Sequence, residues 1–188
     1  MGIEAILGMD NRLFWLVPVV LVGSASACSA TEYLTVVQAQ KLCFPHATRF
    51  SAADVTLTKD QRTQIEKKSR VSVRSSDQKV WAAYTKDTFL GWFIVDEVIG
   101  KHDLITWSLA LTEDGHVKQV DILTYRENYG SEIRDSKWRA QFAGKTSASP
   151  VVADKDIKTI SGATLSSRHV TDGVRRLLAF YDIVLSKS

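Results

Sequence analysis

The chain has 188 residues, of which 45% are hydrophobic and 24% are charged, and it contains three Pro, ten Gly and two Cys. This composition is typical of one globular domain with its own core, and it excludes a disordered chain, a collagen-like repeat, a coiled coil and a disulfide-dense miniprotein. The formal net charge of +3 is too small to indicate a nucleic-acid partner.

The N-terminal segment has the pattern of an export signal. A ten-residue apolar run at residues 13–22 follows Arg12, and the small residues after it end in Ala-Ser-Ala. A basic start, a short apolar centre and a small-residue exit characterise a secretory signal. A membrane-spanning helix needs about 20 residues, and Pro18 argues against a buried helix. We therefore expect residues 1–27 to be a signal peptide, with cleavage after residue 27 or as late as residue 30, and residues 28–188 to form a single exported domain.

The two cysteines leave several arrangements open. Cleavage after residue 27 makes Cys28 the first residue, as in a lipoprotein, and an oxidising compartment allows a disulfide between Cys28 and Cys43. Cleavage after residue 30 removes Cys28 and leaves Cys43 as a small buried hydrophobe. Two thiols are too few for a cysteine-ligated metal or iron–sulfur centre, and the four histidines have no metal-ligand spacing.

The first half of the exported domain is predicted to contain two helices and then a sheet. Residues 35–44 should form a helix that Thr35 caps, and residues 58–68 should form a polar helix that Thr58 caps. Four later segments are rich in β-branched and aromatic residues, as strands are: 79–85, 89–98, 104–111 and 117–125. Short connections, including a Glu-Asp-Gly turn, predict that these strands form an antiparallel sheet with helices on one face.

The C-terminal part is predicted to be mainly helical. A helix is expected at residues 133–143, and a polar linker follows it near residues 146–156. In the last segment apolar side chains recur at helical spacing, at Val170, Val174, Leu177, Tyr181 and Val184. This stripe predicts an amphipathic helix that packs on the sheet. The expected fold class is therefore α+β, an antiparallel β-sheet packed by helices.

Familiar catalytic motifs are missing from the sequence. Ser76 and Lys79 match the S-x-x-K of serine acyl transferases, but the companion motifs are absent. The sequence also lacks a glycine-rich loop of the dinucleotide or P-loop type. It therefore assigns no catalytic residue and no metal ligand.

One segment, residues 160–167, has a pattern that suits a bound anion. Gly162 lets the backbone approach a ligand closely, and Ala163 adds no bulk. The first amides of the helix that follows carry a partial positive charge. Hydroxyls and positive charge are available nearby from Thr164, Ser166, Ser167, Lys158 and Arg168. The alternative interpretation is an ordinary tight turn with Ser/Thr capping.

The sequence Ser-Gly-Ala-Thr-Leu-Ser-Ser at residues 161–167 resembles the flavinylation motif of the FMN-binding domain family. Members of that family include the covalently flavinylated extracytoplasmic subunits of the sodium-translocating NADH:quinone reductase and the Rnf complex. In these subunits a flavin transferase esterifies the last Thr of the motif to the FMN phosphate. The resemblance implies that Thr164 is this acceptor. It also implies that the cofactor is bound by the neighbouring motif residues Ser161, Gly162, Ala163, Leu165 and Ser166.

The resemblance extends upstream of the motif. Residues 127–130, Glu-Asn-Tyr-Gly, occupy the place of a Glu-Thr-Pro-Gly loop, and residues 141–145 resemble a Q-F-x-G-K segment that follows it. This implies that Glu127 orients the loop or the ribityl chain, the alternative being an ordinary surface carboxylate. Tyr125, Tyr129 and Trp138 are candidates to border the flavin ring, the alternative being that at least one of them is a core aromatic. The chain departs from the family pattern at Lys158, where an Asp is usual six residues before the acceptor.

Taken with the export signal, the resemblance implies an electron carrier in the periplasm or on the outer face of the inner membrane. Its cofactor would be covalent FMN, and its partners a flavin transferase and membrane or periplasmic electron-transfer proteins. The chain would be a redox carrier subunit rather than a stand-alone enzyme, because it lacks a nicotinamide-binding motif and a second redox centre. Two alternatives are a flavin-free accessory module of the same fold and an extracytoplasmic flavin reductase acting on a soluble acceptor.

Overall fold

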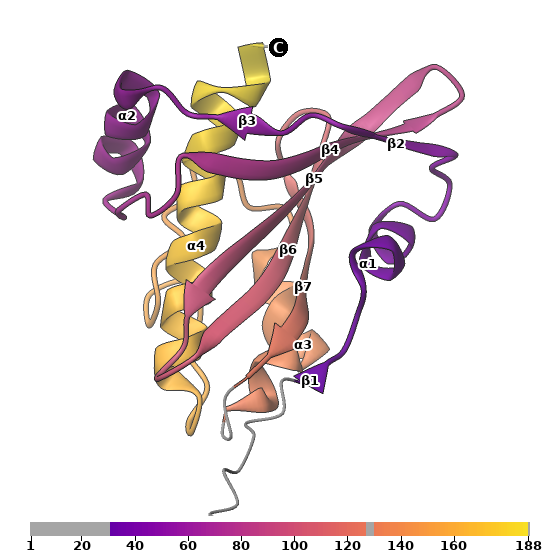
Figure 1. Ribbon diagram of the computed structural model, residues 1–188. Helices are drawn as coiled ribbons and strands as arrows, with labels where there is room; N and C mark the ends of the chain where they lie inside the picture. The colour runs from indigo at the N-terminus through magenta and orange to yellow at the C-terminus, as the bar shows by residue number, and fades with distance from the viewer. Residues whose placement is uncertain (1–30, 127–129, 188) are drawn as a thin grey trace, which may run out of the picture.

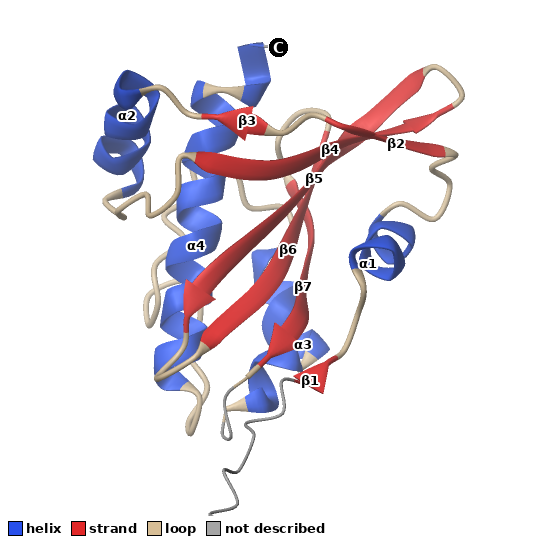
Figure 2. Cartoon of the chain, in the orientation of Figure 1, coloured by secondary structure: helices blue, strands red, loops and turns tan. Residues whose placement is uncertain are grey.

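The computed structural model describes residues 31–126 and 130–187, which form an antiparallel sheet with helices packed on it (Figures 1 and 2). The strand order is β1-β7-β6-β5-β4-β2, and β3 pairs with β4. Four long strands form the centre of the sheet: β4 (Asp77–Thr85), β5 (Thr88–Ile99), β6 (Leu104–Thr112) and β7 (Val117–Tyr125). Three short strands complete it: β1 (Thr31–Glu32), β2 (Arg49–Ala52) and β3 (Val55–Thr56). The α+β fold class and the four long strands are confirmed.

The two N-terminal helices are also confirmed. They are α1 (Val36–Cys43) and α2 (Lys59–Ser69). Each begins with a capping box, in which the cap threonine and a glutamine three residues later satisfy each other's backbone amides. The Thr35 hydroxyl accepts from the Gln38 amide at 3.2 Å, while the Gln38 side chain accepts from the Thr35 amide at 2.8 Å. Thr58 begins α2 in the same way.

The single helix expected at residues 133–143 is wrong. The chain instead forms three short helical pieces: η1 (Ser131–Arg134), α3 (Ser136–Arg139) and η2 (Ala140–Phe142). The break is at Asp135, whose backbone is extended and whose carboxylate accepts from the Lys137 amide at 2.8 Å. Asp135 therefore ends one piece and caps the next.

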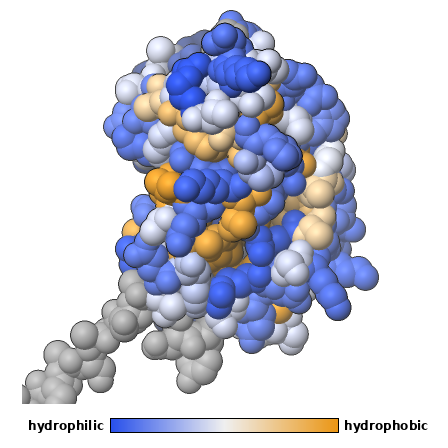
Figure 3. All heavy atoms as spheres, turned by 90° about the vertical axis from the view of Figure 1, so that its right-hand side faces the viewer, coloured by the Kyte–Doolittle hydropathy of each residue, from blue (hydrophilic) through white to orange (hydrophobic). Residues whose placement is uncertain are grey.

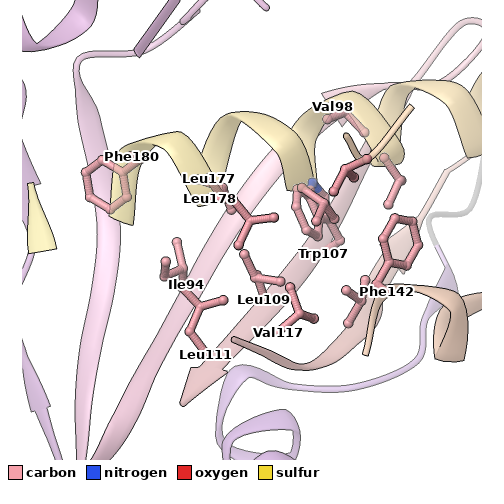
Figure 4. Close-up of a cluster of buried hydrophobic side chains, with 14 of the residues drawn as sticks. Ile94, Val98, Trp107, Leu109, Leu111, Val117, Phe142, Leu177, Leu178 and Phe180 are labelled. Carbon is pink, nitrogen blue, oxygen red and sulfur yellow. The ribbon is translucent and has the colours of Figure 1, made fainter. Parts of the chain in front are cut away.

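The last helix, α4 (Thr164–Ile183), has the predicted amphipathic character and is followed by η3 (Leu185–Lys187). Its apolar side chains, among them Leu177, Leu178 and Phe180, belong to the same buried cluster as Ile94 and Leu109 of the sheet (Figure 4). Fully burying one large apolar side chain stabilises a fold by about 1.5–3 kcal/mol. This helix therefore contributes much of the core.

Helices cover both faces of the sheet, whereas the sequence predicts helices on one face only. Ala39 and Cys43 of α1 pack against Phe93 and Leu123 on the face opposite α4 (Figure 1). Neighbouring residues of one strand alternate between the faces, so that Phe93 belongs to the α1 cluster and Ile94 to the α4 cluster. Hydrophobic residues are visible on the side that Figure 3 shows, with hydrophilic residues around them. Val37 and Leu42 of α1 itself are exposed.

Cys43 is a free, buried thiol. Its Sγ donates to Asp121 at 3.5 Å. Burial, the charge of Asp121 and this hydrogen bond together raise the pKa of the thiol. Of the two arrangements expected for Cys43, a disulfide or a small buried residue, the structure has the second. Cys28 and the predicted signal peptide lie outside the described residues. No helix in the described parts of the chain has the length and hydrophobicity to cross a bilayer.

Candidate functional site

Two segments that are distant in sequence meet at the start of α4. Gly130 follows the loop after β7 and has a φ of 89°, in the left-handed region that favours glycine. A Cβ atom at this position would lie 2.6 Å from the Tyr125 hydroxyl and 3.2 Å from Cβ of Ala163. The Tyr125 hydroxyl in turn shares a 3.3 Å hydrogen bond with Ser166. The end of the β7 loop therefore packs directly on the predicted attachment turn.

Glu127 and Tyr129, the two predicted site residues of that loop, lie outside the described residues. Of the described residues on either side, Arg126 is partly buried and Gly130 is buried. The predicted roles of Glu127 and Tyr129 stay predictions. Tyr125 and Trp138, the other two candidates to border the ring, are 2% and 5% exposed and belong to the buried core, as the alternative interpretation expects.

Thr164, the predicted acceptor, is exposed at the first position of α4. Its hydroxyl donates to the Ile160 carbonyl at 3.2 Å. The turn before it is open, because Gly162 has a φ of 86° and a Cβ atom there would have no heavy atom within 4 Å beyond its chain neighbours. The neighbouring Ser161 and Leu165 are exposed as well. A second protein could therefore reach the Thr164 oxygen from solvent.

The N-terminal end of α4 lacks a side-chain cap among the described residues. Its N-cap position is Ala163, whereas α1 and α2 each have a threonine with a complete capping box. The first amides of a helix have no acceptor within the helix and carry the positive end of its dipole. This 20-residue helix therefore presents first-turn amides beside Thr164 that none of the described side chains accepts from, in the arrangement that binds phosphate in many proteins.

The other two hydroxyls of the motif face inward. Ser166 is 4% exposed and bonds to Tyr125. Ser167 is fully buried and donates to the Ala163 carbonyl at 2.8 Å and the Thr164 carbonyl at 3.1 Å. These hydroxyls stabilise the turn, which leaves Thr164 and Ser161 as the exposed hydroxyls of the motif.

The two basic residues expected near the motif have different surroundings. Lys158 is exposed, and none of the described side chains forms an ion pair with it. Arg168 pairs with Asp154 at 2.5 Å, and Asp154 also accepts from Thr159 at 2.6 Å. The Thr159 hydrogen bond, followed by Arg168, lowers the pKa of Asp154. The charge of Arg168 is thus largely balanced, whereas that of Lys158 is available to an anion.

The Q-F-x-G-K segment holds the backbone that leads into the turn. The Gln141 side chain accepts from the Lys158 amide at 2.8 Å and donates to the Lys158 carbonyl at 3.4 Å. The same carbonyl accepts from the Trp138 indole at 2.8 Å. Both backbone polar groups of Lys158 are therefore fixed by side chains from 17 to 20 residues earlier.

A second support lies at the other end of this segment. Lys145 pairs with Asp156 at 3.2 Å, and the Asp156 carboxylate accepts from the amides of Val151 at 3.1 Å and Val152 at 2.6 Å. Burial raises the pKa of Asp156, but the backbone hydrogen bonds and Lys145 outweigh it, so that the net shift is downward. Together with Gln141, this carboxylate fixes residues 151–158.

Replacing Gln141 with Ala should remove one support without disturbing the core. We expect the free energy of unfolding to fall by about 1–3 kcal/mol, because three hydrogen bonds to a partly solvated backbone are lost, two to Lys158 and one to the Trp138 carbonyl. Denaturant unfolding measures this change. Gln64→Ala on the exposed face of α2 is the control, since it should cost less than about 0.5 kcal/mol. An equal loss in both variants would contradict the role of Gln141.

Asp156 should make stability depend on pH. Because its pKa is lower in the folded than in the unfolded protein, its stabilisation is complete above the unfolded value of about 3.9 and is lost as the pH falls through the folded value. Asp156→Asn should lower the free energy of unfolding at pH 7 by about 1–2 kcal/mol. In this variant the free energy of unfolding should also fall less between about pH 5 and pH 2 than it does in the wild type. Asp87→Asn at an exposed turn is the control for the loss of one surface carboxylate, and it should cost less than about 0.5 kcal/mol at pH 7.

Within residues 31–126 and 130–187, no group of three or more His, Cys, Asp or Glu side chains could hold a metal ion. The described site offers an exposed hydroxyl, that of Thr164, beside the first amides of a helix. This arrangement suits a phosphate group attached to Thr164.

Comparisons with known proteins relate the chain to an FMN-binding family and to a solved structure. Residues 100–179, which include β6, β7 and the predicted attachment turn, match the FMN-binding domain family. None of the curated protein sequences matches the chain. Among solved structures the chain is similar to Shewanella oneidensis NqrC, with a TM-score of 0.52 and 15% sequence identity. The similarity covers 78% of this chain and 88% of that chain, and it shows a shared fold.

Proposed function

We propose, on the premise that residues 100–179 are an FMN-binding domain, that this chain is an electron-transfer flavoprotein with FMN linked to Thr164 through a phosphoester. The observation that carries the proposal is the exposed Thr164 hydroxyl at the uncapped start of α4, inside the matched range. Bound FMN would supply the electron transfer, and the protein would supply its position and electrostatic surroundings.

The residues present suit the phosphate end of FMN. The free amides at the start of α4 would bind the phosphate oxygens, and the open turn at Gly162 leaves room for them. Lys158 would add positive charge. The Thr164 hydroxyl has the Ile160 carbonyl as its hydrogen-bond partner, and none of the described carboxylates or imidazoles bonds to it. This favours attachment by a separate flavin transferase, which would remove the hydroxyl proton.

A covalent link would be useful outside the cytoplasm because it prevents the protein from losing its FMN. A freely dissociating flavin would be diluted beyond recapture, whereas a phosphoester retains it. We propose that the chain is exported through its predicted signal at residues 1–27 and works with membrane or periplasmic redox proteins. The similarity in fold to NqrC supports this class of partner.

Export has a direct test. Fractionation of cells should place the protein in the periplasm or on the outer face of the inner membrane, because residues 13–22 would direct it to the export machinery. Replacing two residues of the apolar run with Asp should retain it in the cytoplasm. A wild-type protein found in the cytoplasm with residues 13–22 intact would contradict export.

A second candidate function is a flavin-free accessory module of the same fold. The presence of Lys158 in place of the family's usual Asp favours it, because a transferase could fail to accept the altered motif. Denaturing electrophoresis separates the two candidates. A band with flavin fluorescence after co-production with a flavin transferase supports the carrier. A dark band from a protein that is also colourless before denaturation supports the accessory module. Turnover of a soluble acceptor by the loaded protein would indicate a reductase instead.

A further inference from the structure

A cavity of about 440 Å³ lies between the end of α2, the loop before the attachment turn and the middle of α4. Its lining contains four basic side chains and no acidic one: Lys68, Arg70, Lys155 and Arg175. Two other cavities along α4 differ in this respect, because Glu97 lines both of them. Ser147 and Ser149 add polar groups to the basic cavity.

Arg175 is fixed in place before any ligand binds. Its Nε donates to the Ser69 carbonyl at 2.8 Å, its Nη1 to the Val151 carbonyl at 3.0 Å and its Nη2 to Asp172 at 2.7 Å. These contacts use three of the five N–H donors of the guanidinium. A cation that is already ordered loses little entropy when it binds an anion.

The cavity carries an excess of positive charge. Asp172 balances Arg175, and Asp182 balances Lys68 at 2.6 Å. Arg70 and Lys155 form no ion pair within the described parts of the chain. Arg70 and Lys155, the two cations without an ion pair among the described residues, therefore line this polar cavity, whose described lining has no carboxylate. Arg70 also lines the neighbouring cavity that Glu97 and Asp172 line.

The backbone around the cavity has unusual conformations. Val151 has a φ of 43° and Arg70 a φ of 57°, both in the left-handed region. This region is rare for a β-branched residue such as Val151, which is held there by its bonds to Arg175 and Asp156. Strained residues persist where the surroundings fix them, and they cluster at binding sites.

We propose that this cavity binds a phosphate group, either of a small phosphorylated molecule or of an anionic phospholipid headgroup. The volume is within the range of small-molecule sites and exceeds the needs of a bare ion. Arg175 is eleven residues beyond Thr164 in α4, about 16 Å along the helix axis. The site is therefore separate from the attachment turn, and the inference does not depend on the proposed flavin function.

The test measures phosphate and vesicle binding by the full chain. Inorganic phosphate is titrated at constant ionic strength against sodium chloride, and calorimetry should detect saturable binding in the millimolar range. Co-sedimentation then compares vesicles of phosphatidylglycerol with vesicles of phosphatidylcholine. Phosphate binding without co-sedimentation assigns a small molecule, whereas co-sedimentation with phosphatidylglycerol alone assigns the headgroup.

The double variant Arg70→Gln/Lys155→Gln removes the two uncompensated cations without touching Arg175. We expect it to weaken binding at least tenfold with an unchanged unfolding midpoint. The control Lys41→Gln/Lys67→Gln has the same change in charge at exposed helix positions outside the cavity, and it should bind as the wild type does. The proposal is overturned if wild type binds neither probe, if chloride has the same effect as phosphate, or if both double variants bind equally.

Discussion

Replacing Thr164 with Ala should abolish covalent flavin while the protein stays folded. The substitution removes the exposed oxygen that would be esterified, and it changes little else, because the hydroxyl makes one hydrogen bond, to the Ile160 carbonyl. Loss of that bond should lower the free energy of unfolding by about 0.5–1.5 kcal/mol. The variant should therefore unfold cooperatively, near the wild-type midpoint, and carry no label.

Peptide mass spectrometry after co-production with a flavin transferase measures the label. Thr164→Ser keeps a hydroxyl at the same position and should keep part of the label. Ser166→Ala and Ser167→Ala should also remain labelled, although both should be less stable, because they lose buried hydrogen bonds. Flavin on the Thr164→Ala variant, or label that maps to Ser166 or Ser167, would show that the acceptor is assigned wrongly.

Gly130→Ala should have the largest effect on stability of the substitutions considered. The backbone at this position has a left-handed φ, which costs other residues about 1–2 kcal/mol. The new Cβ would also collide with the Tyr125 hydroxyl and press on Ala163. Overpacking of this kind adds about 1–3 kcal/mol. We expect a total loss of about 2–5 kcal/mol and less flavin attached, because the attachment turn is pushed away from the β7 loop.

Gly144→Ala is a matched control for the steric part of this effect. Gly144 has a φ of 73°, but a Cβ atom there would meet nothing within 4 Å. Its substitution should cost only the backbone term of about 1–2 kcal/mol and leave labelling intact. Equal losses of stability in the two variants, with equal labelling, would mean that the Gly130 contact does not shape the site.

The elements that could be predicted from the sequence are those with local signals. The long strands and α4 have regular periodicity, and the threonine caps of α1 and α2 are local motifs. The short strands β1 to β3 have too few residues for a period to be seen. The break at Asp135 was not predicted, because an Asp can stand inside a helix as well as cap one. The residues on either side of Asp135 do not indicate that its backbone leaves the helical conformation.

The arrangement of the site could be predicted only in part. The turn, its open glycine and the exposed Thr164 follow from a contiguous motif. The inward hydroxyls and the two supports do not, because Tyr125 and Ser166 are 41 residues apart and Gln141 and Lys158 are 17 apart. No periodicity connects such pairs. The placement of α1 on the opposite face likewise depends on tertiary packing, which an isolated polar-apolar pattern does not determine.

The most direct test of the covalent flavin is the intact mass of the wild-type protein, co-produced with a flavin transferase and measured after denaturation. We predict the mass of the processed chain plus FMN less one water, with the addition absent when the transferase is omitted. An unmodified mass, from a protein whose yellow colour is lost on denaturation, would contradict the phosphoester and indicate a freely dissociating flavin.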